Sequence, residues 1–400
     1  MRIVLKLLAG MAAGILIGLF APDWGIRVAM TVRSLLGELI LFVIPLIILF
    51  FVASGIASLP RNSGQLLGRT LAFAYASTIL AGTLAYFVAV VVLPRLVPPQ
   101  GPPVGDNVTL QPLLAFQVAP LFGVTTGLVA AFIFGLGISA TGSPTLRAFF
   151  DEGRQIIDRL LARVIIPLLP VYIAGVFAGM AADGRVFATL QTFGLVLLIA
   201  VLLHWVWLST LFIVTGLLQG RAPWTLIRLM LPAYVTALGT MSSAATIPVT
   251  LRSVKSLGVR GPIADFVTPL CANIHLSGST ITIVACSTAV MAVSPALGLP
   301  AFGQMLPFIL VLGVVMIAAP GAPGGAVMAA LGLLGSMLGF SEADLALMIA
   351  LYVAQDSFGT ATNVTGDGAI ALWMDRFFGD AVERTAVPDP LQPPLDAAPR

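Results

Sequence analysis

Apolar segments as long as a bilayer-spanning helix recur along most of the chain, and this feature restricts the folds open to it. The first, VLKLLAGMAAGILIGLF at residues 4–20, contains a single charged residue. A helix needs about 20 apolar residues to cross the hydrocarbon core. Only 9% of the residues are charged and 58% are hydrophobic, whereas about a quarter of the residues in a soluble domain are charged. The sequence therefore predicts an all-α membrane protein.

The first half of the chain is expected to contain six spanning helices. They lie near residues 4–21, 35–58, 68–94, 112–139, 156–182 and 188–217. The first has no fitting cleavage site and is expected to be retained rather than removed as a signal peptide. The Pro- and Gly-rich stretch 94–112 is expected to be an extramembrane loop, and residues 381–400 a disordered tail.

The basic residues indicate how the chain is oriented in the membrane. If the N-terminus is cytoplasmic and the segments alternate, all but four of the 20 Lys and Arg residues lie on the cytoplasmic side, as the positive-inside rule requires. The exceptions are Arg27, Arg33, Arg95 and Arg185. Because the basic residues are scattered, the pI of about 9.1 does not point to nucleic acid. We expect both termini in the cytoplasm.

The second half contains four interrupted apolar segments. Residues 223–250 carry GTMSSAAT between two short apolar arms, and residues 303–338 carry APGAPGG. Each is expected to be a re-entrant hairpin, because irregular backbone at membrane depth must be buried in protein or line a cavity. Segments 262–293 and 344–378 are expected to be helices broken at NIHLSGST and at NVTGDG. Interrupted segments in corresponding positions of two halves indicate a secondary transporter.

A polar stripe runs through the last apolar segment. Asp356, Thr360, Asn363 and Asp367 are spaced four, three and four residues apart, so they share one face of a helix. A carboxylate at the bilayer centre costs at least ~2.5–3.5 kcal/mol on insertion scales. Two of them on one stripe predict a cation and substrate site. The alternative is a structural network with Ser or Thr on neighbouring helices.

Further polar groups and glycines lie at the interruptions. Gly366 and Gly368 permit an unwound helix, whose free carbonyls beside the Asp367 carboxylate would suit Na⁺. Ser242 and Ser243 in the first hairpin tip would offer backbone N–H groups to a carboxylate. The alternative for the two serines is a helix contact between small residues.

Both histidines and two more acids also lie in or near apolar spans. His275 lies in a helix break, where it could carry a coupling proton or act as a neutral hydrogen-bonding residue. His204, in LLHWVW, is expected at a helix contact or an interface. Glu38 and Asp265 lie near the ends of their spans and are expected to have local partners or to snorkel.

Three stretches resemble the dicarboxylate/amino acid:cation symporter family, the relatives of the glutamate transporters. They are SSAATIPVT (242–250), PGAPGG (320–325) and DSFGTATNVTGD (356–367), and residues 37–59 are similar to the second helix of that family. The resemblance implies eight transmembrane helices, two re-entrant hairpins, inverted repeats and an elevator fold in a homotrimer. It implies that 1–220 is mainly scaffold, with helices 3 and 6 joining 221–380 as the transport domain.

The resemblance also assigns site residues. The substrate contacts would be Ser242, Ser243, Asp356, Gly359, Thr360, Asn363, Pro320 and Gly321. The Na⁺ ligands would be Asp367, Asn363, Cys271, His275, Asn273, Leu276, Met316 and Ala319. In these roles Ser243 meets the substrate carboxylate, Asp356 holds its ammonium and Asp367 binds Na⁺. No organic cofactor is implied.

Two departures from the family pattern bear on the substrate and the coupling ion. Members that carry acidic substrates have an arginine where this chain has Gly359, and no other cation is nearby in the sequence. An acidic side chain would therefore lack its bidentate partner. The family's N-M-D is His275, Leu276 and Ser277 here, so a third sodium site is expected to be absent and His275 becomes a candidate proton carrier.

The sequence therefore predicts a symporter in a bacterial inner membrane that moves a small, neutral amino acid with Na⁺, or with H⁺ through His275. One alternative is a symporter for dicarboxylates or acidic amino acids, and another is an uncoupled or anion-conducting channel on the same scaffold. An intramembrane hydrolase using His275 with Ser277 or Ser279 is the third alternative. No nucleophile elbow or phosphate loop supports an enzyme, so none is expected.

Overall fold

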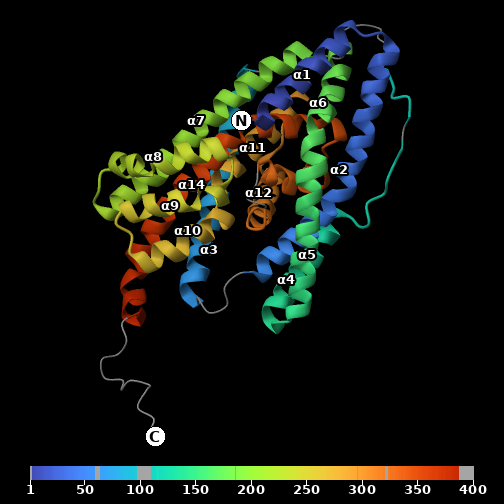
Figure 1. Ribbon diagram of the computed structural model, residues 1–400. Helices are drawn as coiled ribbons and strands as arrows, with labels where there is room; N and C mark the ends of the chain where they lie inside the picture. The colour runs from blue at the N-terminus through green and yellow to red at the C-terminus, as the bar shows by residue number, and fades with distance from the viewer. Residues whose placement is uncertain are drawn as a thin grey trace.

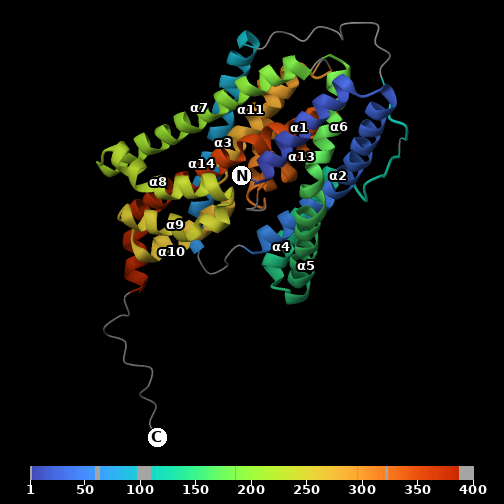
Figure 2. The ribbon, with the colours of Figure 1, turned by 45° about the horizontal axis from the view of Figure 1, so that its top comes forward.

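Every regular element in the part of the chain described by this computed structural model is a helix. The structure describes residues 2–58, 64–96, 110–114, 116–184, 186–294, 296–319 and 323–386. Figures 1 and 2 show an elongated helical body, with α4 and α5 projecting at one end.

One group of helices comes from the first half of the chain. It consists of α1 (Arg2–Phe20), α2 (Asp23–Ala57), α4 (Val124–Thr141), α5 (Pro144–Leu160), the π-helical turn η1 (Leu161–Ile165) and α6 (Ile166–Ala182). The helix α1 packs along α6, and α2 packs on α4, α5 and α6. Gly10, Gly14 and Gly18 lie directly on the backbone of α6, because a Cβ on any of them would fall 2.2 to 2.3 Å from a carbonyl oxygen there.

The second group surrounds two buried helices. Its members are α3 (Gly64–Leu96), α7 (Val186–Gln219), α8 (Pro223–Thr240), α9 (Ser243–Ser256), α10 (Gly261–Ile274), α11 (Ser277–Val293), α12 (Phe302–Met316), α13 (Gly325–Leu338) and α14 (Glu342–Ala386). The helices α11 and α14 pack on each other, and both pack on α3 and α7. Nearly all of α11 is buried, so its polar residues face protein rather than lipid.

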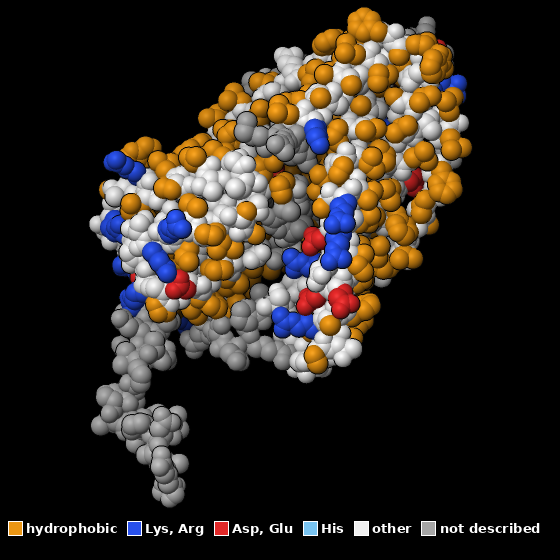
Figure 3. Space-filling model, viewed as in Figure 1, with side chains coloured by type: hydrophobic (Ala, Val, Ile, Leu, Met, Phe, Trp, Pro, Cys, Tyr) orange, Lys and Arg blue, Asp and Glu red, His pale blue; other side chains and the backbone are white. Residues whose placement is uncertain are grey.

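Much of the outer surface is apolar. Large hydrophobic side chains such as Leu16, Ile133 and Leu202 are exposed, and Figure 3 shows hydrophobic side chains spread over most of the visible face. Six helical stretches among the described residues are long and apolar enough to cross a membrane. They are 23–57, 66–95, 124–141, 144–182, 189–219 and 261–293. Since lipid is the solvent that favours such a surface, the chain is a multi-pass membrane protein.

The fourth expected helix starts later than its apolar pattern indicated. It was expected from residue 112, but α4 begins at Val124, and the described residues before it are not helical. Pro112 and Pro120 cannot donate the hydrogen bonds that a helix interior needs. Instead, the backbone of this segment bonds to α2, where Val118 N donates to Glu38 Oε2 at 3.0 Å.

The last helix is not broken. The expectation of an unwound segment at NVTGDG is wrong, because α14 is helical from Glu342 to Ala386. Its glycines allow close packing instead: a Cβ on Gly366 would lie 2.8 Å from His275 Cε1, and one on Gly368 would lie 2.8 Å from Met230 Sδ. The helix also includes 381–386, which were expected to be disordered, and 387–400 lie outside the described residues.

Candidate functional site

The first hairpin tip is a sharp turn between α8 and α9. Met241 ends α8 in the left-handed region with φ 51° and ψ 30°, and Ser242 caps α9 by accepting from Ala245 N at 3.3 Å. Thr246 Oγ1 donates to Ser242 O at 2.8 Å, which ties the turn to the first turn of α9. The turn predicted at GTMSSAAT is therefore present, and it joins the helices α8 and α9. Helix α9 packs on α14.

The break between α10 and α11 falls at His275 and Leu276, as predicted. Their φ/ψ values of −109°/86° and −111°/47° lie outside the helical region. The N-terminus of α11 is held by Asn363 of α14, whose Oδ1 accepts from Gly278 N at 2.8 Å and Ser279 N at 3.2 Å. Asn363 Nδ2 donates to Ser279 Oγ at 2.9 Å. A predicted substrate contact thus also supports the broken helix.

Asp356 joins α14 to the second hairpin. Its Oδ2 accepts from Gly324 N at 2.7 Å, just before α13, and its Oδ1 accepts weakly from Thr360 Oγ1 at 3.5 Å. The side chain is buried. Among the described residues no Lys or Arg forms an ion pair with it, so the charge is balanced only by dipoles.

Asp367 belongs to a buried chain of three side chains. Asp367 Oδ1 lies 2.9 Å from His275 Nδ1, and His275 Nε2 lies 2.9 Å from Ser77 Oγ on α3. Asp367 Oδ2 is buried and has no hydrogen-bond partner among the described residues. An unpartnered carboxylate oxygen in a protein interior is costly, so this atom fits a cation ligand.

Gly359 lies where α11 and α14 cross. A Cβ on Gly278 would fall 2.3 Å from Gly359 O, and a Cβ on Gly359 would fall 3.2 Å from Thr282 Oγ1. The position at which acidic-substrate members carry an arginine is therefore in close contact with α11.

His204 also lies in this region, and the sequence did not indicate which residues it would contact. Its Nε2 lies 3.0 Å from Gly278 O and 3.1 Å from Thr282 Oγ1, and the side chain is buried. The helix contact expected for His204 is therefore a contact with the break in α11. The available signal was its position in an apolar span, since a polar side chain there needs a partner.

The remaining predicted residues that the structure describes lie in three places. Cys271 and Leu276 are buried beside the break. Asn273 and Ala319 line a cavity of about 360 Å³ between α2, α5, α10 and the end of α12, which Met316 terminates. Ser243 is buried at the start of α9. Pro320 and Gly321 lie outside the described residues.

Two further acids, Asp265 and Glu38, have partners away from the buried site, and the partner of Glu38 is distant in the sequence. Asp265 Oδ1 is 2.7 Å from Lys255 Nζ in an exposed ion pair. Glu38 Oε2 accepts from the Val118 amide. Neither carboxylate belongs to the buried group around α14.

Together these features define a class of protein. A helical membrane protein with two buried carboxylates on one inner helix, beside a broken helix and the sharp turn between α8 and α9, has the arrangement found in secondary transporters. The profile of the sodium:dicarboxylate symporter family matches residues 3–377. The chain belongs to this family, which confirms the resemblance seen in the sequence.

Individual relatives carry two kinds of name. The chain is 31% identical to excitatory amino acid transporter 1 of Homo sapiens over 59% of this chain and 43% of that protein. It is 30% identical to excitatory amino acid transporter 4 of Mus musculus over 67% of this chain and 49% of that protein. It is 26% identical to the C4-dicarboxylate transport protein of Sphingopyxis alaskensis over 100% of this chain and 94% of that protein.

These coverages limit what is carried over. The matches span less than half the length of the excitatory amino acid transporters. The relatives are named as transporters and not as enzymes. This confirms the prediction that the protein is not an enzyme.

Proposed function

We propose that the protein is a secondary active symporter that moves a small neutral amino acid across a bacterial inner membrane with Na⁺. One observation carries this proposal: Asp356 and Asp367 are both buried on α14, and neither forms an ion pair with a Lys or Arg among the described residues. A substrate ammonium at one carboxylate and a cation at the other would balance both charges.

The substrate would lie between α14 and the two hairpin tips. Its ammonium would meet Asp356 with Thr360 alongside. Its carboxylate would meet Ser242 and Ser243, where α9 begins, and would replace the bond that the Ser242 amide donates to Thr240 Oγ1 at 3.3 Å. A helix N-terminus favours an anion because its first N–H groups have no partners within the helix. Pro320 and Gly321 of the second hairpin would close over the substrate.

Na⁺ would sit beside Asp367 Oδ2. Asn363, Cys271, His275 and Leu276 are the nearby candidates to complete its ligands. A second Na⁺ would be held near the end of α12 by Asn273, Met316 and Ala319. Coupling to H⁺ through His275 is the alternative, and ion-gradient experiments separate the two.

A dicarboxylate or acidic amino acid is the second candidate substrate. Two observations favour it: the relative matched along the whole chain is named a C4-dicarboxylate transport protein, and Arg154 of α5 lines the cavity that reaches Ala319. Arg154 could supply the cation that Gly359 lacks. A neutral substrate is preferred here because Asp356 would repel a dicarboxylate that has no amino group.

Transport would follow an elevator movement of two bodies in a homotrimer. In support, α3 and α7 pack mainly with the helices that follow residue 221, whereas α1, α2, α4, α5 and α6 pack mainly with one another. The two groups also meet, where α2 contacts α13 and α6 contacts α14. The first residue of α14, Glu342, lies against Gly37, which is fourteen residues or ~20 Å along α2 from its start. Gly55 at the other end of α2 contacts Ala318. If the N-terminus is cytoplasmic, α2 starts on the outer side of the membrane and ends on the cytoplasmic side. The helices around α14 would then be displaced toward the cytoplasm relative to α2.

The test is uptake of radiolabelled L-alanine into proteoliposomes. A Na⁺ gradient should drive uptake, serine should compete, and aspartate and succinate should not. Best competition by aspartate or succinate would replace the neutral substrate with the acidic one. Uptake driven by a pH gradient without Na⁺ would replace the coupling ion.

A further inference from the structure

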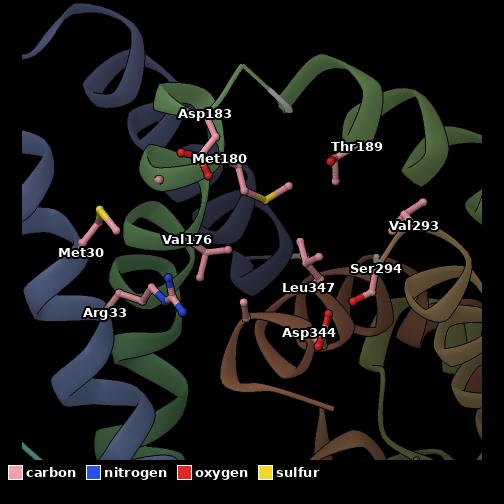
Figure 4. A pocket seen from close by; sticks show the side chains of 12 residues that line it. Met30, Arg33, Val176, Met180, Asp183, Thr189, Val293, Ser294, Asp344 and Leu347 are labelled. Atoms are coloured by element: carbon pink, nitrogen blue, oxygen red, sulfur yellow. The ribbon is translucent and has the colours of Figure 1, made fainter. Parts of the chain in front are cut away.

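A polar cavity lies between α2, α6, the start of α7 and the facing ends of α11 and α14 (Figure 4). The charged side chains around it interact with other residues. Asp344 Oδ2 accepts from Ser341 N at 3.0 Å and from Ser341 Oγ at 2.6 Å, and the charge of Arg33 interacts with that of Glu342 at the start of α14. Asp183 also has a partner. Nothing in this cavity therefore requires a charged ligand.

A buried chain of three side chains, away from that cavity, links α3 to the middle of α14. Ser77 Oγ on α3 lies 2.9 Å from His275 Nε2, and His275 Nδ1 lies 2.9 Å from Asp367 Oδ1. The exposed fraction is 3% for Ser77 and 1% for each of the other two residues. The imidazole at the break between α10 and α11 is therefore held on both sides, by helices that are distant in the sequence.

The direction of these two hydrogen bonds follows from the atoms that make them. An ionised carboxylate can only accept, so the hydrogen between the ring and Asp367 is on His275 Nδ1. A neutral imidazole then has no hydrogen on Nε2, which accepts from a hydroxyl. In the part of the chain that the structure describes, Ser77 Oγ makes no other hydrogen bond, so its hydrogen points to the ring. Ser77 thereby favours the tautomer that donates to Asp367.

The backbone of α14 supports the same ring from a third direction. A Cβ on Gly366 would lie 2.8 Å from His275 Cε1 and 3.6 Å from His275 Nδ1. The edge of the imidazole between its two nitrogens is therefore in contact with the helix. A larger residue at position 366 would push the ring away from Asp367.

We propose that Ser77 is a positioning residue of the cation site, an inference that rests on the proposed Na⁺ site at Asp367. Ser77 holds His275, and His275 holds Asp367 Oδ1. Asp367 Oδ2, which has no hydrogen-bond partner within the described residues, then stays directed at the cation. Groups that orient a metal ligand in this way contribute about 10–100-fold to the affinity for the metal. Ser77 acts through the ring and does not touch the cation.

The order Ser–His–Asp is also that of a hydrolase triad, but the surroundings of Ser77 do not suit acyl transfer. A nucleophilic serine must be reached by its substrate and must lie beside donors for the oxyanion. Ser77 is buried in the interior of α3. The N–H groups of a helix interior are bonded to carbonyls one turn back, so they are not free to stabilise an oxyanion. These contacts therefore serve to orient the ring.

The first measurement is ¹⁵N solid-state NMR of the full, histidine-labelled chain in lipid bilayers. The chain has two histidines, and H275Q identifies the signals of His275 by removing them. The wild type should show a hydrogen on Nδ1 and a hydrogen-bonded Nε2 without one. S77A should move the Nε2 signal toward that of a free imidazole nitrogen. T78A is the matched control and should leave it in place, because Thr78 Oγ1 donates to Ala74 O at 2.8 Å.

The second measurement is the thermal stabilisation of the purified chain by NaCl, with choline chloride keeping the ionic strength constant. In S77A the Na⁺ concentration for half-maximal stabilisation should rise about tenfold. S77T keeps the hydroxyl and should stay close to the wild type, as should T78A, whereas G366A should behave like S77A. In the H275Q background S77A should add nothing, because two residues that act through one contact are not additive.

The proposal is overturned if S77A leaves either the His275 signals or the Na⁺ dependence unchanged. It is also overturned if S77A weakens Na⁺ binding equally with and without His275, if T78A gives the same loss, or if both nitrogens of His275 carry a hydrogen in the wild type. A wild type that Na⁺ does not stabilise would instead contradict the proposed coupling ion, and the signals of S77A would still decide whether Ser77 holds the ring.

Discussion

His275 Nδ1 lies 2.9 Å from Asp367 Oδ1, and this contact joins the break between α10 and α11 to the middle of α14. The imidazole fixes one carboxylate oxygen and leaves Oδ2 unpartnered. Replacing His275 in H275Q should therefore weaken Na⁺ binding about 10–100-fold, as loss of a group that orients a metal ligand does. The measurement is uptake against Na⁺ concentration. An unchanged Na⁺ affinity would remove His275 from the cation site.

Asp367 and Asp375 both lie on α14, and replacing each of them in turn gives a matched comparison. In D367N the proposed Na⁺ ligand loses its charge, so Na⁺-driven uptake should be abolished. Asp375 pairs with Arg260 at 3.3 Å outside the buried site, so D375N should keep Na⁺-driven uptake and its Na⁺ affinity. Equal loss of uptake in both variants at equal expression would show a general effect of charge removal.

His204 should matter for the shape of the α11 break. In H204L, Gly278 O loses its contact with His204 but still accepts from Thr282 Oγ1 at 3.2 Å, so the loss of stability should be about 0.5–1.5 kcal/mol. Because Gly278 N is held by Asn363, substrate affinity should fall as well. H204N keeps a side-chain donor and should recover part of both effects. Thermal unfolding and substrate competition measure them, and a loss of stability without any change in affinity would restrict His204 to a structural role.

The helix crossing at Gly278 and Gly359 predicts an asymmetry. G278A places a Cβ 2.3 Å from a backbone oxygen, whereas G359A places one 3.2 Å from a side-chain hydroxyl. Backbone cannot move aside as a hydroxyl can, so G278A should lose about 1–3 kcal/mol or more and G359A clearly less. Detergent unfolding curves test the order. The reverse order would mean that the two helices cross differently.

The contact of α1 with α6 gives a prediction far from the site. In G14V the new side chain would collide with Ala174 O, which lies 2.2 Å from the Cβ position, and α1 should separate from α6. Gly194 on α7 has nothing within 4 Å of its Cβ position, so G194A should be neutral or slightly stabilising, as Ala favours helix over Gly. Yield of folded protein by size exclusion compares the two.

The sequence alone determined the features that depend on neighbouring residues. Long apolar runs fixed the helical membrane class, because hydrocarbon requires backbone hydrogen bonds within each segment. The turn at Met241–Ser242 and the break at His275–Leu276 were predicted from small and polar residues inside apolar runs. The four-three-four spacing placed Asp356 and Asp367 on one helix.

Only the tertiary structure decided which contacts the glycines and polar residues of those elements make. Gly366 and Gly368 looked like helix breakers, yet they allow His275 and Met230 to approach an unbroken α14. Glu38 holds the amide of Val118, in a segment whose apolar pattern had indicated a helix. His204 contacts the start of α11, which is distant from it in the sequence. The local sequence pattern determines which conformations have a low free energy, whereas contacts between distant segments determine which of them is stable.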